Sequence, residues 1–174
     1  MAISEILKEK LILAVDDEED VLDIIEEELN ETAECTLHKA TTFERAQQYL
    51  VSYTYDLVIL DIMGVRGFDL LNASVSLGFP TVMLTAHALN KEALKKSIEM
   101  GARAYLPKEK MAEIAPFLEQ VLSLSYRPGW KYVFEKLGGF FNAQFGPGWQ
   151  KKEKDFWEAV ASGQFEHEPV ILKK

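Results

Sequence analysis

Five polar side chains of the kinds that handle metal ions and phosphate each follow a short apolar run of the sequence. Asp16 and Asp17 come after LILAV, Asp61 closes DLVILD, Thr85 closes PTVMLT, and Lys108 follows RAYLP. Three carboxylates brought close together repel one another, and a cation among them relieves that repulsion. Oxygen ligands of this kind suit Mg²⁺, which typically uses one or two carboxylates together with phosphate oxygens. The residue types therefore predict a magnesium and phosphate site, provided that the runs end side by side.

The elements that must position these residues follow one repeated pattern. Between residues 10 and 124, a short β-rich run followed by a stretch of helical periodicity occurs five times, with the runs at residues 11–16, 34–40, 56–61, 80–85 and 103–106. Strand then helix, repeated in this way, predicts a parallel sheet with helices on both faces. In open sheets of this kind, ligands bind at the carboxyl ends of the strands, where all five polar residues fall.

The same residues suggest a reaction. A carboxylate held beside Mg²⁺ can attack a phosphoryl group and form an aspartyl phosphate. The transferred group carries negative charge on its equatorial oxygens, which the Lys108 ammonium, the Thr85 hydroxyl and the metal ion would neutralise.

Four motifs occur in a fixed order along residues 9 to 124. They are the acidic pair after the first run, Asp61 in DLVILDIMG, Thr85 in MLTAHA, and GARAYLPK, which ends at Lys108. In this order they resemble the receiver domain of two-component response regulators. The resemblance implies an α/β, flavodoxin-like fold of five βα units, a three-layer sandwich with parallel strand order 2-1-3-4-5.

The resemblance also implies a role for each site residue. Asp61 would be the phosphoacceptor, with Thr85 bonding to the phosphoryl group and Lys108 pairing with it. The Mg²⁺ cofactor would be held by Asp17 directly, by Asp16 through water, by Asp61, and by the backbone carbonyl of Met63. Thr85 and Tyr105 would form the switch, because Tyr105 would change rotamer when Thr85 moves.

The function that follows from the resemblance is two-component signalling. Asp61 would take a phosphoryl group from a sensor histidine kinase or a phosphotransfer protein, and the domain would switch conformation to control a downstream protein. Such a phosphoprotein phosphorylates itself and slowly dephosphorylates itself, and is a signalling domain rather than a metabolic enzyme.

The residues are also compatible with two other functions. The first is a phosphorylation-independent pseudo-receiver that serves as an interaction or dimerisation module, although such a module has no need of the acidic set with Thr85 and Lys108. The second is a phosphohydrolase of the haloacid dehalogenase type, which also uses an aspartyl nucleophile. That class needs a second Asp two residues after the first, where this chain has Met63.

The sequence departs from the receiver pattern directly after the phosphoacceptor. The chain reads DIMGVRGFDLL, so Gly64 and Val65 stand where the family has Met and Pro. The loop thereby loses the rigidity of proline. Gly67 can still supply an irregular turn before a helix that begins near Phe68.

The composition changes after residue 125. Residues 126–174 hold 11 of the 19 aromatic residues and all three tryptophans, and residues 125–174 hold 8 Lys and Arg against 6 Asp and Glu, in a chain whose net charge is -9. We therefore divide the chain into a receiver domain, residues 1–125, and an aromatic-rich helical extension, residues 126–174. We expect one helix that contains Trp130 and ends at Gly138 and Gly139, and a second from Gln150 to Ala161.

Two short helices cannot form a core alone, so the extension must pack on something else. Phe117 and Leu124 are apolar positions outside the inward stripe of the fifth helix, and they would suit a covering partner. We expect the extension to pack on that helix or on a second copy of the chain in a homodimer. In receiver domains this side forms the output face, so the extension would regulate or replace partner binding there.

Composition also limits the partners and the compartment. The longest apolar runs are about five residues, too short for a membrane span, and Glu5 and Glu9 do not suit a signal peptide. The negative charge disfavours nucleic acid, and the single cysteine, Cys35, allows no intramolecular disulfide. A cytoplasmic protein is expected. In the acidic run after the first strand, Glu18 to Asp20 are expected to start a helix and face water.

Overall fold

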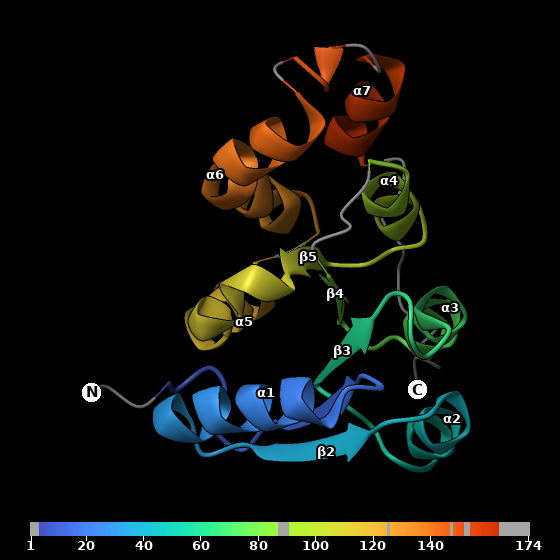
Figure 1. Ribbon diagram of the computed structural model, residues 1–174, viewed down its shortest axis with the longest axis vertical. Coiled ribbons are helices and arrows are strands. Elements are labelled where there is room, and N and C mark those ends of the chain that lie inside the picture. Colours follow the sequence, from blue (N-terminus) through green and yellow to red (C-terminus); the bar gives the residue numbers. More distant parts are fainter. Residues whose placement is uncertain (1–3, 87–90, 125, 147, 152–153, 164–174) are drawn as a thin grey trace, which may run out of the picture.

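Five parallel strands form one sheet at the centre of the molecule (Figure 1). This computed structural model describes residues 4–86, 91–124, 126–146, 148–151 and 154–163, so residues 164–174 of the expected extension lie outside it. The strand order is β2-β1-β3-β4-β5, which confirms the flavodoxin-like topology. The strands are β1 (Leu11–Val15), β2 (Thr36–Ala40), β3 (Leu57–Asp61), β4 (Thr81–Thr85) and β5 (Ala104–Pro107).

Helices cover both faces of the sheet (Figure 1). On one face lie α1 (Glu19–Thr32) and α5 (Ile114–Ser123), and on the other lie α2 (Phe43–Ser52), α3 (Gly67–Ser76) and α4 (Lys91–Glu99). The fifth helical segment begins as a 3₁₀ helix, η1 (Lys108–Glu113), which precedes α5. As a result Lys108 begins a tight turn directly after β5, beside the carboxyl ends of the other strands.

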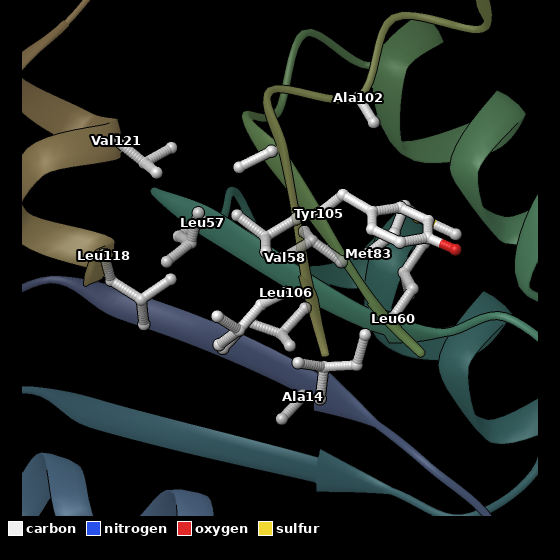
Figure 2. Packing of buried hydrophobic residues seen from close by; sticks show 14 of the residues in the cluster. Ala14, Leu57, Val58, Leu60, Met83, Ala102, Tyr105, Leu106, Leu118 and Val121 are labelled. Carbon is white, nitrogen blue, oxygen red and sulfur yellow. The ribbon is translucent and has the colours of Figure 1, made fainter. Parts of the chain in front are cut away.

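Continuous apolar runs place β1, β3, β4 and β5 inside the core, where helices cover both sides of each strand. Every residue of β3, β4 and β5 is buried, whereas β2 is only partly covered at one side of the sheet. Successive side chains of a strand point to opposite faces. Tyr105 and Leu106 accordingly leave β5 on opposite sides, and Leu118 and Val121 of α5 lie on the side of Leu106 (Figure 2).

The extension contains two helices, α6 (Tyr126–Phe145) and α7 (Lys154–Ser162). The expected helix end at Gly138 and Gly139 is wrong, because α6 runs through both glycines. A Cβ at either glycine would meet nothing within 4 Å, whereas Leu137 and Phe141 on the same helix are buried. Burial of this apolar stripe offsets the helix penalty of about 0.5–1 kcal/mol for each glycine. Helix α7 also begins later than expected, after a turn at residues 148–151.

The extension shares the hydrophobic core of the sheet domain. Six of its buried residues belong to the same apolar cluster as the strands: Trp130, Val133, Leu137, Phe141, Trp149 and Val160. Helix α6 lies beyond β5 next to α5, and α7 lies next to α4 (Figure 1). The rings of Phe117 in α5 and Tyr132 in α6 are 5.9 Å apart, and Lys95 of α4 lies 5.0 Å from the ring of Phe156 in α7.

Among the described residues, no helix is both long enough and apolar enough to cross a bilayer.

Candidate functional site

The strand register gathers the predicted site residues at one end of the sheet. Asp61 at the end of β3 pairs with Leu84 of β4, and Thr85 at the end of β4 pairs with Pro107 of β5. Lys108 follows Pro107 directly. The ends of β4 and β5 are level and that of β3 is one residue short of them, so their terminal side chains can act on one ligand.

Lys108 lies between two buried carboxylates. Its Nζ is 2.8 Å from Oδ2 of Asp16 and 3.2 Å from Oδ1 of Asp61. The three side chains are 13%, 0% and 6% exposed, respectively. Ion pairs at this depth are weakly screened, and removal of one partner leaves an uncompensated charge in the interior. The three residues therefore form one electrostatic unit.

The end of β1 is shaped by the second oxygen of Asp16. The backbone N–H of Glu18 donates to Asp16 Oδ1 at 2.9 Å, which turns the chain out of the strand and into α1. Burial raises the pKa of Asp16, against the lowering effect of its bonds to Lys108 and to the Glu18 amide. Burial opposes the charge of Lys108, but its bonds to Asp16 and Asp61 outweigh that effect and raise the pKa of Lys108.

An acidic group suited to a divalent ion lies beside this unit. Among the described residues, carboxylate oxygens of Asp16, Asp17 and Glu18 lie within 4.8 Å of one another. Asp61, a predicted ligand, is not part of this cluster as described, but it lies on the other side of Lys108, which pairs with both Asp16 and Asp61. All the side-chain ligand atoms are carboxylate oxygens, the class that Mg²⁺ prefers. The residues present therefore fit this ion.

Glu18 is a site residue that the sequence reasoning missed. Its Oε1 lies 3.6 Å from Lys108 Nζ, although it was expected to face water as part of the helix start. Its side chain is 65% exposed, so Glu18 faces water as expected and also lies near the Lys108 ammonium. The only signal in the sequence is its position directly after the acidic pair.

Two backbone amides close the loop after Asp61 by hydrogen bonds. The N–H of Gly64 donates to Asp61 Oδ2 at 3.0 Å, and the N–H of Gly67 donates to the Ile62 carbonyl at 3.1 Å. Val65 is buried in the place of the usual proline. Arg66, rather than a glycine, takes the left-handed conformation with φ 56° before α3. Gly67 is required for another reason, because a Cβ there would overlap the Asp61 carbonyl.

Gly64 makes room for a predicted metal ligand. A Cβ at Gly64 would overlap the carboxylate group of Asp17, so a side chain at this position would require the Asp17 carboxylate to shift. Gly64 is thus a positioning residue for the acidic group. The departure from the receiver pattern at this point has a direct steric consequence at the site.

The remaining predicted residues occupy distinct places around this unit. Thr85 is buried, and its hydroxyl donates to the Ala86 carbonyl at 3.2 Å. Tyr105 is fully buried, and its hydroxyl makes no hydrogen bond of ordinary geometry among the described residues, although Thr85 lies close enough to lower the pKa of that hydroxyl. Burial raises the pKa of Tyr105 to about 12. Met63 is 83% exposed, so its side chain takes no part in the buried unit.

This arrangement can present one carboxylate oxygen to an electrophile. The two oxygens of Asp61 are held by different groups, one by the Lys108 ammonium and one by the Gly64 amide. A cation and a backbone donor fixed beside a carboxylate stabilise negative charge that is transferred to it. The described geometry therefore suits phosphoryl transfer to Asp61 better than proton abstraction.

Comparison with known proteins gives a consistent result. Residues 12–117 match a family model described as the response regulator receiver domain. A response regulator receiver domain protein from Methanospirillum hungatei is 24% identical, with a TM-score of 0.60, and the match covers 66% of this chain and 94% of that chain. A putative response regulator from Chloroflexus aurantiacus is 25% identical, with a TM-score of 0.59, over 67% and 99% of the two chains.

A third solved structure is a signal receiver domain of an HD domain-containing protein from Pseudomonas fluorescens. It is 28% identical, with a TM-score of 0.60, over 66% of this chain and 95% of that chain. A search of curated proteins by sequence gives no match.

Proposed function

Because the chain belongs to the response regulator receiver family, we propose that Asp61 accepts a phosphoryl group from a sensor histidine kinase or a phosphotransfer protein. The observation that carries this proposal is the buried unit of Lys108 with Asp16 and Asp61. Burial of three charged groups carries a desolvation cost, and such arrangements are concentrated at functional sites. The protein would act in the cytoplasm and pass the signal to a downstream protein.

The transfer step is a displacement at phosphorus. A carboxylate oxygen of Asp61 attacks the phosphorus atom of a phosphohistidine, a P–O bond forms and the P–N bond breaks. The electron pair of the broken bond stays on the imidazole nitrogen, which then takes up a proton. Gly64 holds one oxygen of Asp61 by its backbone N–H, and so limits the orientations from which the carboxylate can attack.

The transferred group brings negative charge into the site. Lys108 is close enough to Asp61 to pair with a phosphoryl oxygen once the acyl phosphate has formed. Asp16 and Asp17, together with Asp61 and the Met63 carbonyl, would hold Mg²⁺, which when bound neutralises the phosphoryl oxygens. Thr85 would donate to the phosphoryl group, and its movement would allow Tyr105 to change rotamer.

The experiment that tests the proposal is phosphorylation by acetyl phosphate with Mg²⁺, followed by intact mass measurement. We expect the wild-type chain to gain one phosphoryl group, and Asp61→Asn to gain none. Asp69→Asn is the matched control, because Asp69 is exposed and pairs only with Arg66 among the ion pairs described; it should gain one group like the wild type. No gain in the wild type, or an undiminished gain in Asp61→Asn, would favour a phosphorylation-independent interaction module instead.

A further inference from the structure

The start of the extension is bonded to the residues that lead into β5. The indole Nε1 of Trp130 donates to the Ala102 carbonyl at 2.9 Å, and both groups are buried. The guanidinium of Arg103 donates to the Leu124 carbonyl, at the end of α5. The first turns of α6 are therefore bonded to the backbone of Ala102, and the residue at the end of α5 is bonded to the Arg103 side chain.

The second attachment is made by side chains further along α6. The rings of Tyr105 and Phe141 lie 6.4 Å apart between centroids, and both residues are fully buried. Phe141 is itself enclosed by other rings of the extension, with Phe134 at 5.9 Å and Trp149 at 6.1 Å. Tyr105 lies on the side of β5 opposite Leu106 (Figure 2). It cannot change position without a change in the packing of α6.

The same short strand also carries the site. Strand β5 has four residues, and Lys108 follows its last residue. One end of this segment is thus attached to the extension, and the other is paired with Asp16 and Asp61. Transfer of a phosphoryl group to Asp61 removes the carboxylate charge that Lys108 pairs with and places a dianionic group beside it. The segment must then adjust to a different partner at its carboxyl end.

We propose that α6 and α7 are an intramolecular ligand of β5 that binds most tightly while Lys108 is paired with the unmodified Asp61 carboxylate. The inference rests on the proposed function, since phosphorylation is the event that changes this pairing. Phosphorylation loosens the extension through Tyr105 and Phe141. By thermodynamic reciprocity, the docked extension weakens binding of a phosphoryl group at Asp61 by the same factor.

The tryptophans allow the first test to be made on the full chain. All three tryptophans lie in the extension, so tryptophan emission reports on that segment alone. After reaction with acetyl phosphate and Mg²⁺, we expect a change in emission and about fivefold or faster amide hydrogen exchange in α6, with Mg²⁺ alone as the control. Intact mass is measured on the same sample. Phosphorylation with unchanged or slower exchange in α6 would overturn the inference alone, whereas no mass gain would overturn the proposed function and with it this inference.

The second test removes the connecting ring. Phe141→Ala should raise the affinity for beryllofluoride with Mg²⁺, a phosphoryl analogue, by about fivefold or more. Phe145→Ala is the matched control, because Phe145 stacks on Phe141 at 5.9 Å and belongs to the same ring cluster. It should leave the affinity close to that of the wild type. Phe141→Leu, which keeps an apolar side chain in place, serves if the alanine variant does not fold. Equal affinities in the Phe141 and Phe145 variants would contradict the coupling.

Discussion

The carboxylate of Asp17 occupies the space in which a side chain at Gly64 would begin. Gly64 is not among the residues with positive φ, so its backbone can accept alanine and the obstacle is the contact alone. We expect Gly64→Ala to displace Asp17 and to lower Mg²⁺ affinity by about 10- to 100-fold, as for other groups that orient metal ligands. Calorimetric titration with Mg²⁺ measures this loss.

Gly139→Ala is the control for that substitution. A Cβ at Gly139 would meet nothing within 4 Å, and alanine in a helix interior is favoured over glycine by about 0.5–1 kcal/mol. This variant should keep the Mg²⁺ affinity and gain slightly in stability. Wild-type affinity in Gly64→Ala would show that Asp17 does not need the position described here.

Lys108 is expected to stabilise the protein as well as the transferred group. Lys108→Met leaves the buried carboxylates of Asp16 and Asp61 without a cation, which should lower the free energy of unfolding by about 3 kcal/mol. Added Mg²⁺ should restore part of the loss, because it supplies positive charge at the same place. Urea unfolding with and without Mg²⁺ measures both effects.

A surface lysine provides the comparison. Lys39 pairs with Asp23 and Glu26, and its side chain is 34% exposed. Lys39→Met should lower the free energy of unfolding by less than about 1 kcal/mol, and Mg²⁺ should not change this loss. Similar losses at both positions would mean that the buried unit contributes no more than a surface ion pair.

Substitution of two tryptophans distinguishes the contribution of a hydrogen bond to stability from that of ring packing. Trp130→Phe removes the donor to the buried Ala102 carbonyl, whereas the Nε1 of Trp157 has no hydrogen-bond partner among the described residues. We expect Trp130→Phe to destabilise the chain by about 1–2 kcal/mol more than Trp157→Phe, because only the first leaves a buried acceptor without its donor. Chemical unfolding of both variants gives the difference, and equal losses would exclude a role for the indole bond.

Tyr105 should make stability depend on alkaline pH. Burial raises its pKa to about 12 from the ordinary value of 10.0, so the unfolded chain releases this proton at a lower pH than the folded chain does. The contribution is complete below pH 10 and is lost as the pH rises toward 12, by about 2–3 kcal/mol in total.

Tyr105→Phe isolates this effect from the other tyrosines. The variant should gain in unfolding free energy relative to the wild type as the pH rises above 10, because only the wild type loses the contribution of Tyr105. Near pH 7 the variant should be at least as stable as the wild type, because it removes a buried hydroxyl that makes no hydrogen bond of ordinary geometry among the described residues. A difference that stays constant from pH 8 to 11 would contradict the raised pKa.

The sheet and the strand-end positions could be predicted from the sequence for a simple physical reason. Strands buried on both faces read as continuous apolar runs, and parallel strands end at one side of the sheet, so Asp61, Thr85 and Lys108 had to be neighbours. In α1, the apolar residues recur every three or four positions, and Val21, Leu22, Ile25 and Leu29 are indeed the buried ones.

The features that escaped prediction depend on tertiary contacts. A pair of glycines locally favours a helix end, but burial of Leu137 and Phe141 carries α6 past them. The approach of Asp17 to Gly64 depends on how two loops from different strands lie against each other. No local pattern encodes that relation. The sequence pattern does not predict the contact of Glu18 with Lys108 for the same reason.

The position of α6 also has a consequence for how the sheet avoids self-association. β5 is an outermost strand, and such strands offer free backbone N–H and C=O groups to which another chain can add. In this protein α6 covers that strand, and the indole of Trp130 donates a hydrogen bond to the carbonyl of Ala102, which precedes the strand. We therefore expect truncation at residue 125 to expose β5 as an unprotected edge strand, together with the ring of Tyr105. Because six residues of the extension belong to the same apolar cluster as the strands, we expect the sheet domain and the extension to unfold together.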